Sequence, residues 1–262
     1  MKKKFLFFLW LLACSNSLIS QVKVKSKNLS NSNSFVDLIQ KAHRFDAFHK
    51  QKAVVFDVES VSEGKATPFS TITSLTGSGK IKFESSNGKT VVFDGKKTWI
   101  TPANTDYPRA RFDIFTYHYF FMAPFKLSDK GAKWELLSDK VYDFNDYARA
   151  KLTFQSETGD SPNDWYIAHR NKATNYLEAL SYIVTYGGKP VAEAEKKASA
   201  IFYSDWKSVE GVMFATTWKF MNWSDDKGFF NPKGEIKIKN IRFVIPTEKT
   251  FLVPLDSKEI GL

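Results

Sequence analysis

Alternation of apolar and polar positions dominates the chain from residue 53 onward and predicts a mainly β protein. In AVVFDVES (53–60), Val54, Phe56 and Val58 share one face of a strand. Similar runs lie at residues 79–85, 90–93, 96–101, 133–144, 147–157, 164–170, 175–186, 196–206, 211–223 and 234–246. Turn sequences such as Asp94-Gly95 separate them. We expect about ten antiparallel strands in one continuous domain.

Two segments break this period and predict helices. In SFVDLIQKAHRFDAFHK (34–50), apolar residues recur at spacings of three and four, as on an amphipathic helix. The second segment, FDIFTYHYFFMAPFKL (112–127), carries apolar side chains on every side of a helix. A helix of that kind must be covered on nearly all sides. It is too short and too polar to span a bilayer, so other parts of the protein or a ligand must cover it.

The strand at residues 211–223 (GVMFATTWKFMNW) has more apolar surface than one core contact requires. Phe214, Trp218 and Phe220 share one face, whereas Met221 and Trp223 lie on the other. A sheet with one solvated face alternates more cleanly. This strand therefore has apolar material on both sides, either a ligand opposite a core or the plain core of a sandwich.

The first twenty residues predict a secretory signal peptide. Lys2, Lys3 and Lys4 precede the apolar run FLFFLWLL, which is too short for a transmembrane span. Two processing sites stay open: acylation at Cys14 after Leu-Leu-Ala, or cleavage after Ser20. We expect a signal peptide at 1–20, a flexible linker at 21–33 and a single domain at 34–262. Cys14 is the one cysteine, so the mature chain can form no internal disulfide.

Charge and motifs exclude several function classes. The formal net charge is +10, of which the three leader lysines contribute part, and the rest is spread along the chain. We expect no nucleic-acid partner for an exported protein, whereas a basic surface suits contact with anionic lipid headgroups. No sequence motif of a hydrolase, metal site or nucleotide site is present, so we assign no catalytic residue, metal or cofactor. The four histidines are not spaced as a metal site, and His169 is expected at the surface.

Two stretches resemble the LolA/LolB-like lipoprotein-carrier superfamily. They are YSDWKSVEGV (203–212) and DWYIAHRNKATNYLEALSYIV (164–184), and the order of elements matches over most of residues 34–245. Ala215 stands where many relatives have proline, so the resemblance is to an uncharacterised envelope branch rather than to a true carrier. It implies an α+β fold in which a half-open antiparallel β-barrel wraps a helical lid. An apolar cavity between barrel and lid then accepts acyl chains.

These patterns together predict a site and a function. Phe115, Tyr119 and Met122 of the lid, with Phe214, Trp218 and Phe220 of the long strand, are expected to line one apolar cavity. We expect a monomeric, non-enzymatic envelope protein that binds a lipid, an acyl chain or an acylated protein. Its location is periplasmic, or at the outer membrane through a lipid on Cys14. The alternative is a glycan-binding or glycan-cleaving envelope protein that uses aromatic side chains as sugar platforms.

Overall fold

The computed structural model describes residues 32, 34–62, 65–66, 69–77, 79–155 and 159–261. The expected signal peptide, Cys14 and nearly all of the expected linker lie outside these residues. After a helix over residues 34–43, the elements in chain order are α2 (Phe45–Lys50), β1 (Ala53–Ser62), β2 (Lys65–Ala66), β3 (Ser70–Leu75), β4 (Ile81–Ser85), β5 (Thr90–Phe93), β6 (Thr98–Thr101), α3 (Ala110–Lys126), β7 (Ala132–Tyr142), β8 (Asn145–Phe154), β9 (Tyr166–Asn171), β10 (Leu177–Tyr182), α4 (Val191–Glu195), β11 (Ser199–Val209), β12 (Val212–Ser224), β13 (Gly228–Val244) and β14 (Lys258–Ile260).

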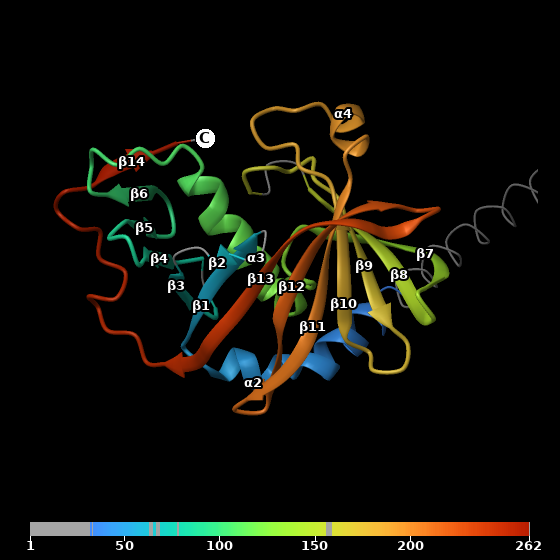
Figure 1. The fold of residues 1–262 in the computed structure, drawn as a ribbon. Helices are drawn as coiled ribbons and strands as arrows, with labels where there is room; N and C mark the ends of the chain where they lie inside the picture. Colours follow the sequence, from blue (N-terminus) through green and yellow to red (C-terminus); the bar gives the residue numbers. More distant parts are fainter. Residues whose placement is uncertain are drawn as a thin grey trace, which may run out of the picture.

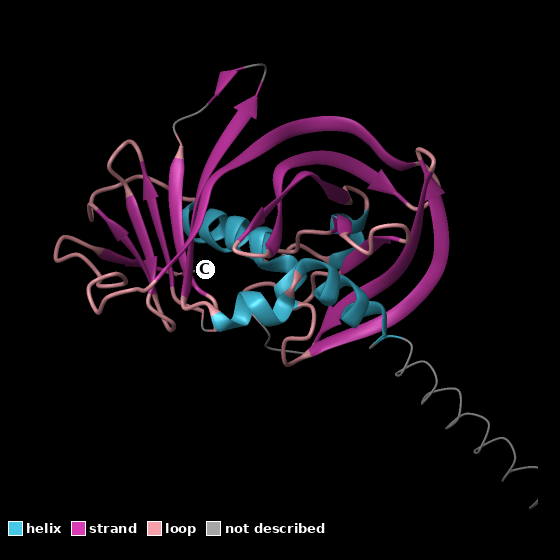
Figure 2. Cartoon of the chain, turned by 90° about the horizontal axis from the view of Figure 1, so that it is seen from below, coloured by secondary structure: helices cyan, strands magenta, loops and turns pink. Residues whose placement is uncertain are grey.

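All strands of the described residues belong to one antiparallel sheet. Its order is β14-β6-β5-β4-β3-β1-β13-β12-β11-β10-β9-β8-β7, and β2 pairs with β1 outside this path. In the described part of the chain the edge strands β14 and β7 do not pair with each other, so the sheet stays open. The sheet bends around the helices, as Figure 1 and the view from below in Figure 2 show. The expected half-open barrel with a helical lid is confirmed.

Three strands of the described residues lie outside the runs expected from sequence: β2, which has two residues, β3 and β14. β3 is STITSL, in which serine and threonine dilute the apolar alternation, although Ile72 is fully buried. β14 has three residues, too few to show any period. Both add to the smaller side of the sheet, where β14, β6, β5, β4 and β3 lie in Figure 1.

Aromatic stacking packs α3 against the sheet and against the helices before β1. The Phe121 ring lies parallel to that of Phe56 on β1, with centroids 3.7 Å apart, and near that of Phe214 on β12 at 5.1 Å. Phe125 stacks on Phe48 of α2 at 3.9 Å. These side chains are buried and belong to the main core cluster. This half of α3 is therefore enclosed by protein on the sheet side and on the side of α2.

Side chains from the sheet satisfy backbone groups of α3 that the helix leaves free. Pro124 lacks the N–H that would bond to the carbonyl of residue 120, and the buried Tyr203 hydroxyl of β11 donates to that Phe120 oxygen at 3.0 Å. At the end of the helix, the Trp134 indole of β7 donates to the Leu127 carbonyl at 2.9 Å. The C-terminal half of α3 is thus fixed to two strands.

His43 connects the N-terminal helix to two strands. Its Nε2 accepts a hydrogen bond from the Leu177 amide at 3.1 Å, so the proton resides on Nδ1, which donates to the Met213 carbonyl at 3.1 Å. The ring is fully buried, and this burial lowers the pKa of His43 to about 4. The imidazole is therefore neutral and acts as a structural bridge.

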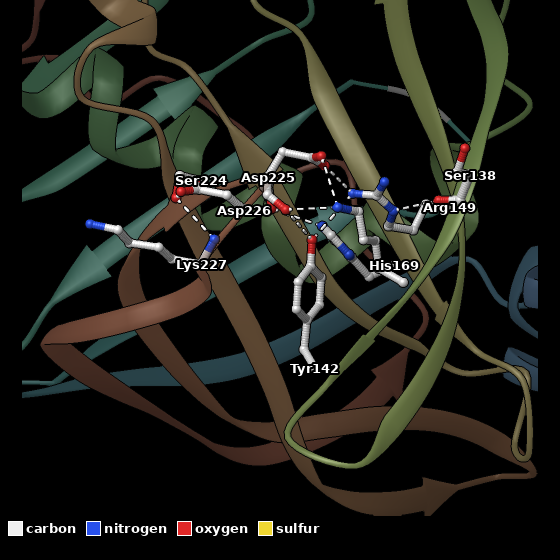
Figure 3. Close-up of polar contacts among 10 residues, drawn as sticks. Ser138, Tyr142, Arg149, His169, Ser224, Asp225, Asp226 and Lys227 are labelled. Atoms are coloured by element: carbon white, nitrogen blue, oxygen red, sulfur yellow. Dashed lines mark hydrogen bonds and ion pairs between the residues drawn. The ribbon is translucent and has the colours of Figure 1, made fainter.

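The turn between β12 and β13 folds over the outer face of β7 to β9 and is fastened there by a buried charge (Figure 3). The Arg149 side chain is 3% exposed, and its Nη1 donates to Asp225 Oδ1 at 2.5 Å. This hydrogen bond holds the pKa of Asp225 below its usual value. Gly228 passes so close to Tyr142 that a Cβ there would lie 2.6 Å from the ring, and its φ of +72° also favours glycine.

The expectation that His169 lies at the surface is wrong. It points to the outer face of β9, but the β12–β13 turn covers that face and leaves His169 fully buried, with Nε2 2.8 Å from Ser181 Oγ. A second apolar cluster, which includes Trp165, Ile167 and Trp223, lies on the same face. Burial lowers the pKa of His169 to about 3, with a further contribution from the Arg149 charge.

Because three histidines are buried, we predict that the protein loses stability in mild acid. Burial lowers the pKa of His43 to about 4 and that of His118 and His169 to about 3, from an ordinary value of 6.5. Below pH 6.5 the unfolded chain binds more protons than the folded one, so the free energy of unfolding falls as the pH drops. Urea unfolding at pH 7.5 and 5.5 should differ by about 1.4 kcal/mol for each histidine, or about 4 kcal/mol for the three. Equal free energies at the two pH values would contradict their burial.

Candidate functional site

A cavity of about 1080 Å³ lies between α3 and the sheet. Its volume is at the upper end of the range for small-molecule sites in proteins. The walls come from α3, from β4 and β5 on one side, and from β8 to β13 on the other. Aromatic side chains supply most of the apolar lining, namely Phe93, Phe112, Phe115, Tyr117, Tyr119, Phe120, Phe154, Tyr166, Tyr182, Tyr186 and Phe220.

The structure places three of the six residues expected at the site on this cavity and three elsewhere. Phe115 and Tyr119 of α3 and Phe220 of β12 line it. Met122, Phe214 and Trp218 lie in the packed core and are at most 3% exposed. Phe214 and Trp218 instead border a void of about 10 Å³ near His43, which has room for no ligand.

Four wall residues from β9, from β10 and from the segment after β10 were not among those expected: Tyr166, Tyr182, Val184 and Tyr186. Tyr119 packs on Tyr166 with centroids 5.0 Å apart, and Tyr166 packs on Tyr182 at 6.1 Å. The signal for three of them is present in the sequence, because positions 182, 184 and 186 share one strand face. The sequence does not show that this face meets the same side of α3 as Phe220.

Hydroxyl groups give this aromatic wall some polar character. Burial raises the pKa of Tyr119, Tyr166 and Tyr182 well above the usual value, so these phenols stay protonated. Nearby, Asp164 Oδ1 accepts hydrogen bonds from the amide and the hydroxyl of Thr185, both at 2.7 Å. Burial raises the pKa of Asp164. The wall can therefore solvate a polar group of a ligand without presenting a strong charge.

His118 is the polar residue of α3 that faces this cavity from a buried position. It is 7% exposed, and its Nε2 has no hydrogen-bond partner among the described residues. Burial, with a smaller contribution from the Lys126 charge, lowers the pKa of His118 to about 3. The imidazole is therefore neutral, and its Nε2 is a buried polar atom without a partner among the described residues, next to the cavity wall.

Arg111 ties the N-terminal end of α3 across the cavity. Its guanidinium donates two hydrogen bonds to Asp160, from Nε at 2.7 Å and from Nη2 at 2.8 Å. Nη1 donates to Thr98 Oγ1 of β6 at 2.6 Å. Both charged side chains are mostly buried, which makes a bidentate pair of this kind stronger than a surface ion pair. Arg111 thus joins α3 to the loop before β9 and to the small side of the sheet.

The described residues offer no metal site at this cavity, and acidic side chains on its wall form ion pairs. No group of three histidine, cysteine or acidic side chains that could hold a metal is found among them. Of the acidic residues on the wall, Asp113 pairs with Arg109 and Asp160 with Arg111. No helix in the described part of the chain has the length and hydropathy needed to cross a membrane.

Loss of the Arg111 contact is predicted to loosen the first turns of α3 but not the last. In Arg111→Ala, hydrogen exchange should rise at least about tenfold in residues 110–118, because an ion-paired hydrogen bond is worth about 1.5–3 kcal/mol. Residues 120–126 keep the Tyr203 and Trp134 hydrogen bonds and should exchange as in the wild type. Arg109→Ala is the matched control, since Arg109 is exposed and pairs within its own helix. Equal protection of residues 110–118 in both variants would refute the role of Arg111.

Comparison with solved structures identifies the fold. A LolA superfamily protein from Nitrosomonas europaea superposes with a TM-score of 0.54 at 10% identity, covering 85% of this chain and 97% of that one. A DUF1329 family protein from Desulfovibrio piger gives 0.51 at 14% identity, covering 84% and 96%. An outer-membrane lipoprotein-sorting protein domain from Vibrio parahaemolyticus gives 0.50 at 9% identity, covering 83% and 95%. No protein-family model and no curated protein sequence matches the chain. The fold is that of the LolA/LolB-like superfamily.

Proposed function

We propose that this protein is a non-enzymatic cell-envelope protein that binds an acyl chain, as a lipid or as part of an acylated protein, in the cavity beside α3. The observation that carries the proposal is the cavity itself, which has a volume of about 1080 Å³ and an apolar lining made mostly of aromatic rings. Structures of similar fold include a LolA superfamily protein and a lipoprotein-sorting domain, which supports this class of ligand.

The energetics of burial favour an acyl chain as the occupant. Each methylene removed from water is worth about 0.8 kcal/mol, so a 16-carbon chain gains roughly 12 kcal/mol before association costs. α3 has 17 residues and is therefore about 25 Å long, enough to lie beside an extended chain of that size. Micromolar affinity then requires no ion pair and no catalytic group.

The alternative of a glycan-cleaving protein receives less support from the cavity. Glycoside hydrolysis generally uses two carboxyl groups of different roles that face each other across the sugar. Four of the five acidic wall residues form ion pairs with basic side chains, namely Asp113, Asp129, Asp160 and Glu235, which leaves Asp164 with a raised pKa. One such carboxyl group does not make the pair, so we favour binding without catalysis.

Export is part of this proposal and rests on the sequence of the first twenty residues. Lys2–Lys4 followed by FLFFLWLL is the pattern of a secretory signal, and Cys14 is the candidate for lipidation. A binder of acyl chains in the envelope would work either in the periplasm or at the outer membrane. It would then meet its ligand as a monomer at, or on the way to, a membrane surface.

A bulky side chain inside the cavity is predicted to block the ligand. Val184 is half-buried on the wall, so Val184→Trp should fill part of the space that an acyl chain needs. Titration with a fluorescent 16-carbon fatty acid should show at least about tenfold weaker binding than in the wild type, since a lost 1.4 kcal/mol already gives that factor.

Val141→Trp is the matched control for this substitution. Val141 is 66% exposed on β7 and does not line the cavity, so its replacement should leave the affinity unchanged. Circular dichroism of both variants establishes that they are folded. Equal binding by wild type and Val184→Trp, or no binding by folded wild-type protein, would refute the proposed function.

A further inference from the structure

Not every basic side chain on the cavity wall has an acidic partner. Six basic and five acidic residues line it. Arg109, Arg111 and Lys126 form ion pairs with acidic residues of the same wall, and Glu235 pairs with Lys237 at 2.8 Å. Three lysines are left without a carboxylate partner among the described residues: Lys96, Lys130 and Lys233. The acidic residue left over is Asp164, whose carboxyl group two hydrogen bonds from Thr185 already engage.

Lys233 is the most informative of these lysines. Its Nζ donates to Ser199 Oγ at 2.8 Å, a neutral partner across the sheet from β13 to β11. Burial against the wall lowers the pKa of Lys233 although the side chain still reaches solvent. A partly desolvated ammonium group with only a hydroxyl partner gains from an anion at the same place. Lys233 and Ser199 thus form a site at the cavity mouth, with Phe220 and Tyr182 on the adjoining wall.

We propose that the occupant of the cavity is an anionic single-chain amphiphile. Its carboxylate or phosphate head contacts Lys233 and Ser199, and its chain lies on the aromatic wall beside α3. This inference rests on the proposed function. It adds the sign of the charge on the ligand's head group and the position of that group in the cavity. The opposite choice, an ammonium head, would place a cation beside Lys233, which has no carboxylate partner among the described residues.

The remaining polar groups of the wall agree with a single anionic head at the mouth. His118 and the tyrosine hydroxyls lie in the interior as neutral groups, so they can accompany a chain or an ester but cannot neutralise a charge. A charged head in the interior would lose its hydration without gaining a counter-ion there. The charge therefore belongs at Lys233, next to solvent.

The test compares ligands that share a 12-carbon alkyl chain and differ in the charge of the head group. The neutral dye N-phenyl-1-naphthylamine occupies the cavity of wild-type protein, and laurate, dodecyl phosphate, dodecanol and dodecylammonium compete for it below their micelle concentrations. Laurate and dodecyl phosphate should displace the dye at about tenfold lower concentration than dodecanol or dodecylammonium, as one charge-assisted contact predicts. Inorganic phosphate and acetate, which lack the chain, should not displace it.

Substitutions of Lys233 test whether the ligand's head group binds at this residue. Lys233→Gln should reduce the advantage of laurate over dodecanol to less than about twofold, whereas Lys233→Arg should retain it. Lys207→Gln, an exposed lysine of β11 outside the cavity wall, should behave as the wild type.

Each failure has its own meaning. Equal displacement by laurate and dodecanol in the wild type would overturn the anionic head but leave the acyl-chain function standing. An unchanged laurate advantage in Lys233→Gln would overturn the assignment to Lys233. Failure of the dye and of every amphiphile to bind folded protein would overturn both this inference and the proposed function.

Discussion

The structure depends on one constraint, that α3 has no side that can face water. Ile114, Phe121 and Phe125 are buried, and Phe115 and Tyr119 on other sides of the helix are apolar as well. A flat sheet would cover one side only. The open, curved sheet covers α3 from two directions, with Phe56 and Phe214 stacked around Phe121. Over the first two-thirds of the helix the cover is incomplete, and the cavity is the consequence.

The two halves of α3 are held differently, and this separates core from site. The C-terminal half is packed against α2 and fixed by hydrogen bonds from Tyr203 and Trp134. The N-terminal half is held by Arg111, whose partners lie on a loop and on β6, and by ring contacts such as that of Phe115 with Phe93. The packed core therefore lies along the C-terminal half of α3, and most of the cavity lies along the N-terminal half. The ion pair between Arg149 and Asp225, which holds the β12–β13 turn, lies on the opposite face of the sheet and stabilises the fold.

The sequence predicts the fold well because alternation and helical periodicity are local properties. The strand at 90–93 and the helix at 110–126 fall where the pattern indicates them, and the resemblance to the LolA/LolB-like superfamily supplies the barrel shape. The site is only half predictable. A helical wheel groups Phe115, Tyr119 and Met122 on one side of the helix. It does not show where along the helix the cavity ends and the packed core begins, and Met122 lies in the packed core. Strand parity likewise groups Phe214, Trp218 and Phe220, of which only Phe220 reaches the cavity. His169 shows the same limit, because parity gives its face but not the turn that covers it.

The central claim is that the space beside α3 holds an acyl chain, and a crystal of the protein grown with 12-bromododecanoate tests it most directly. Anomalous scattering locates the bromine at the end of the chain independently of any interpretation of the remaining density. The account predicts one bromine peak inside the cavity, beside the aromatic side chains of α3 such as Phe115 and Tyr119, and away from the head-group position at Lys233. A bromine peak only on the outer surface, or a cavity closed by collapse of these side chains, would contradict it.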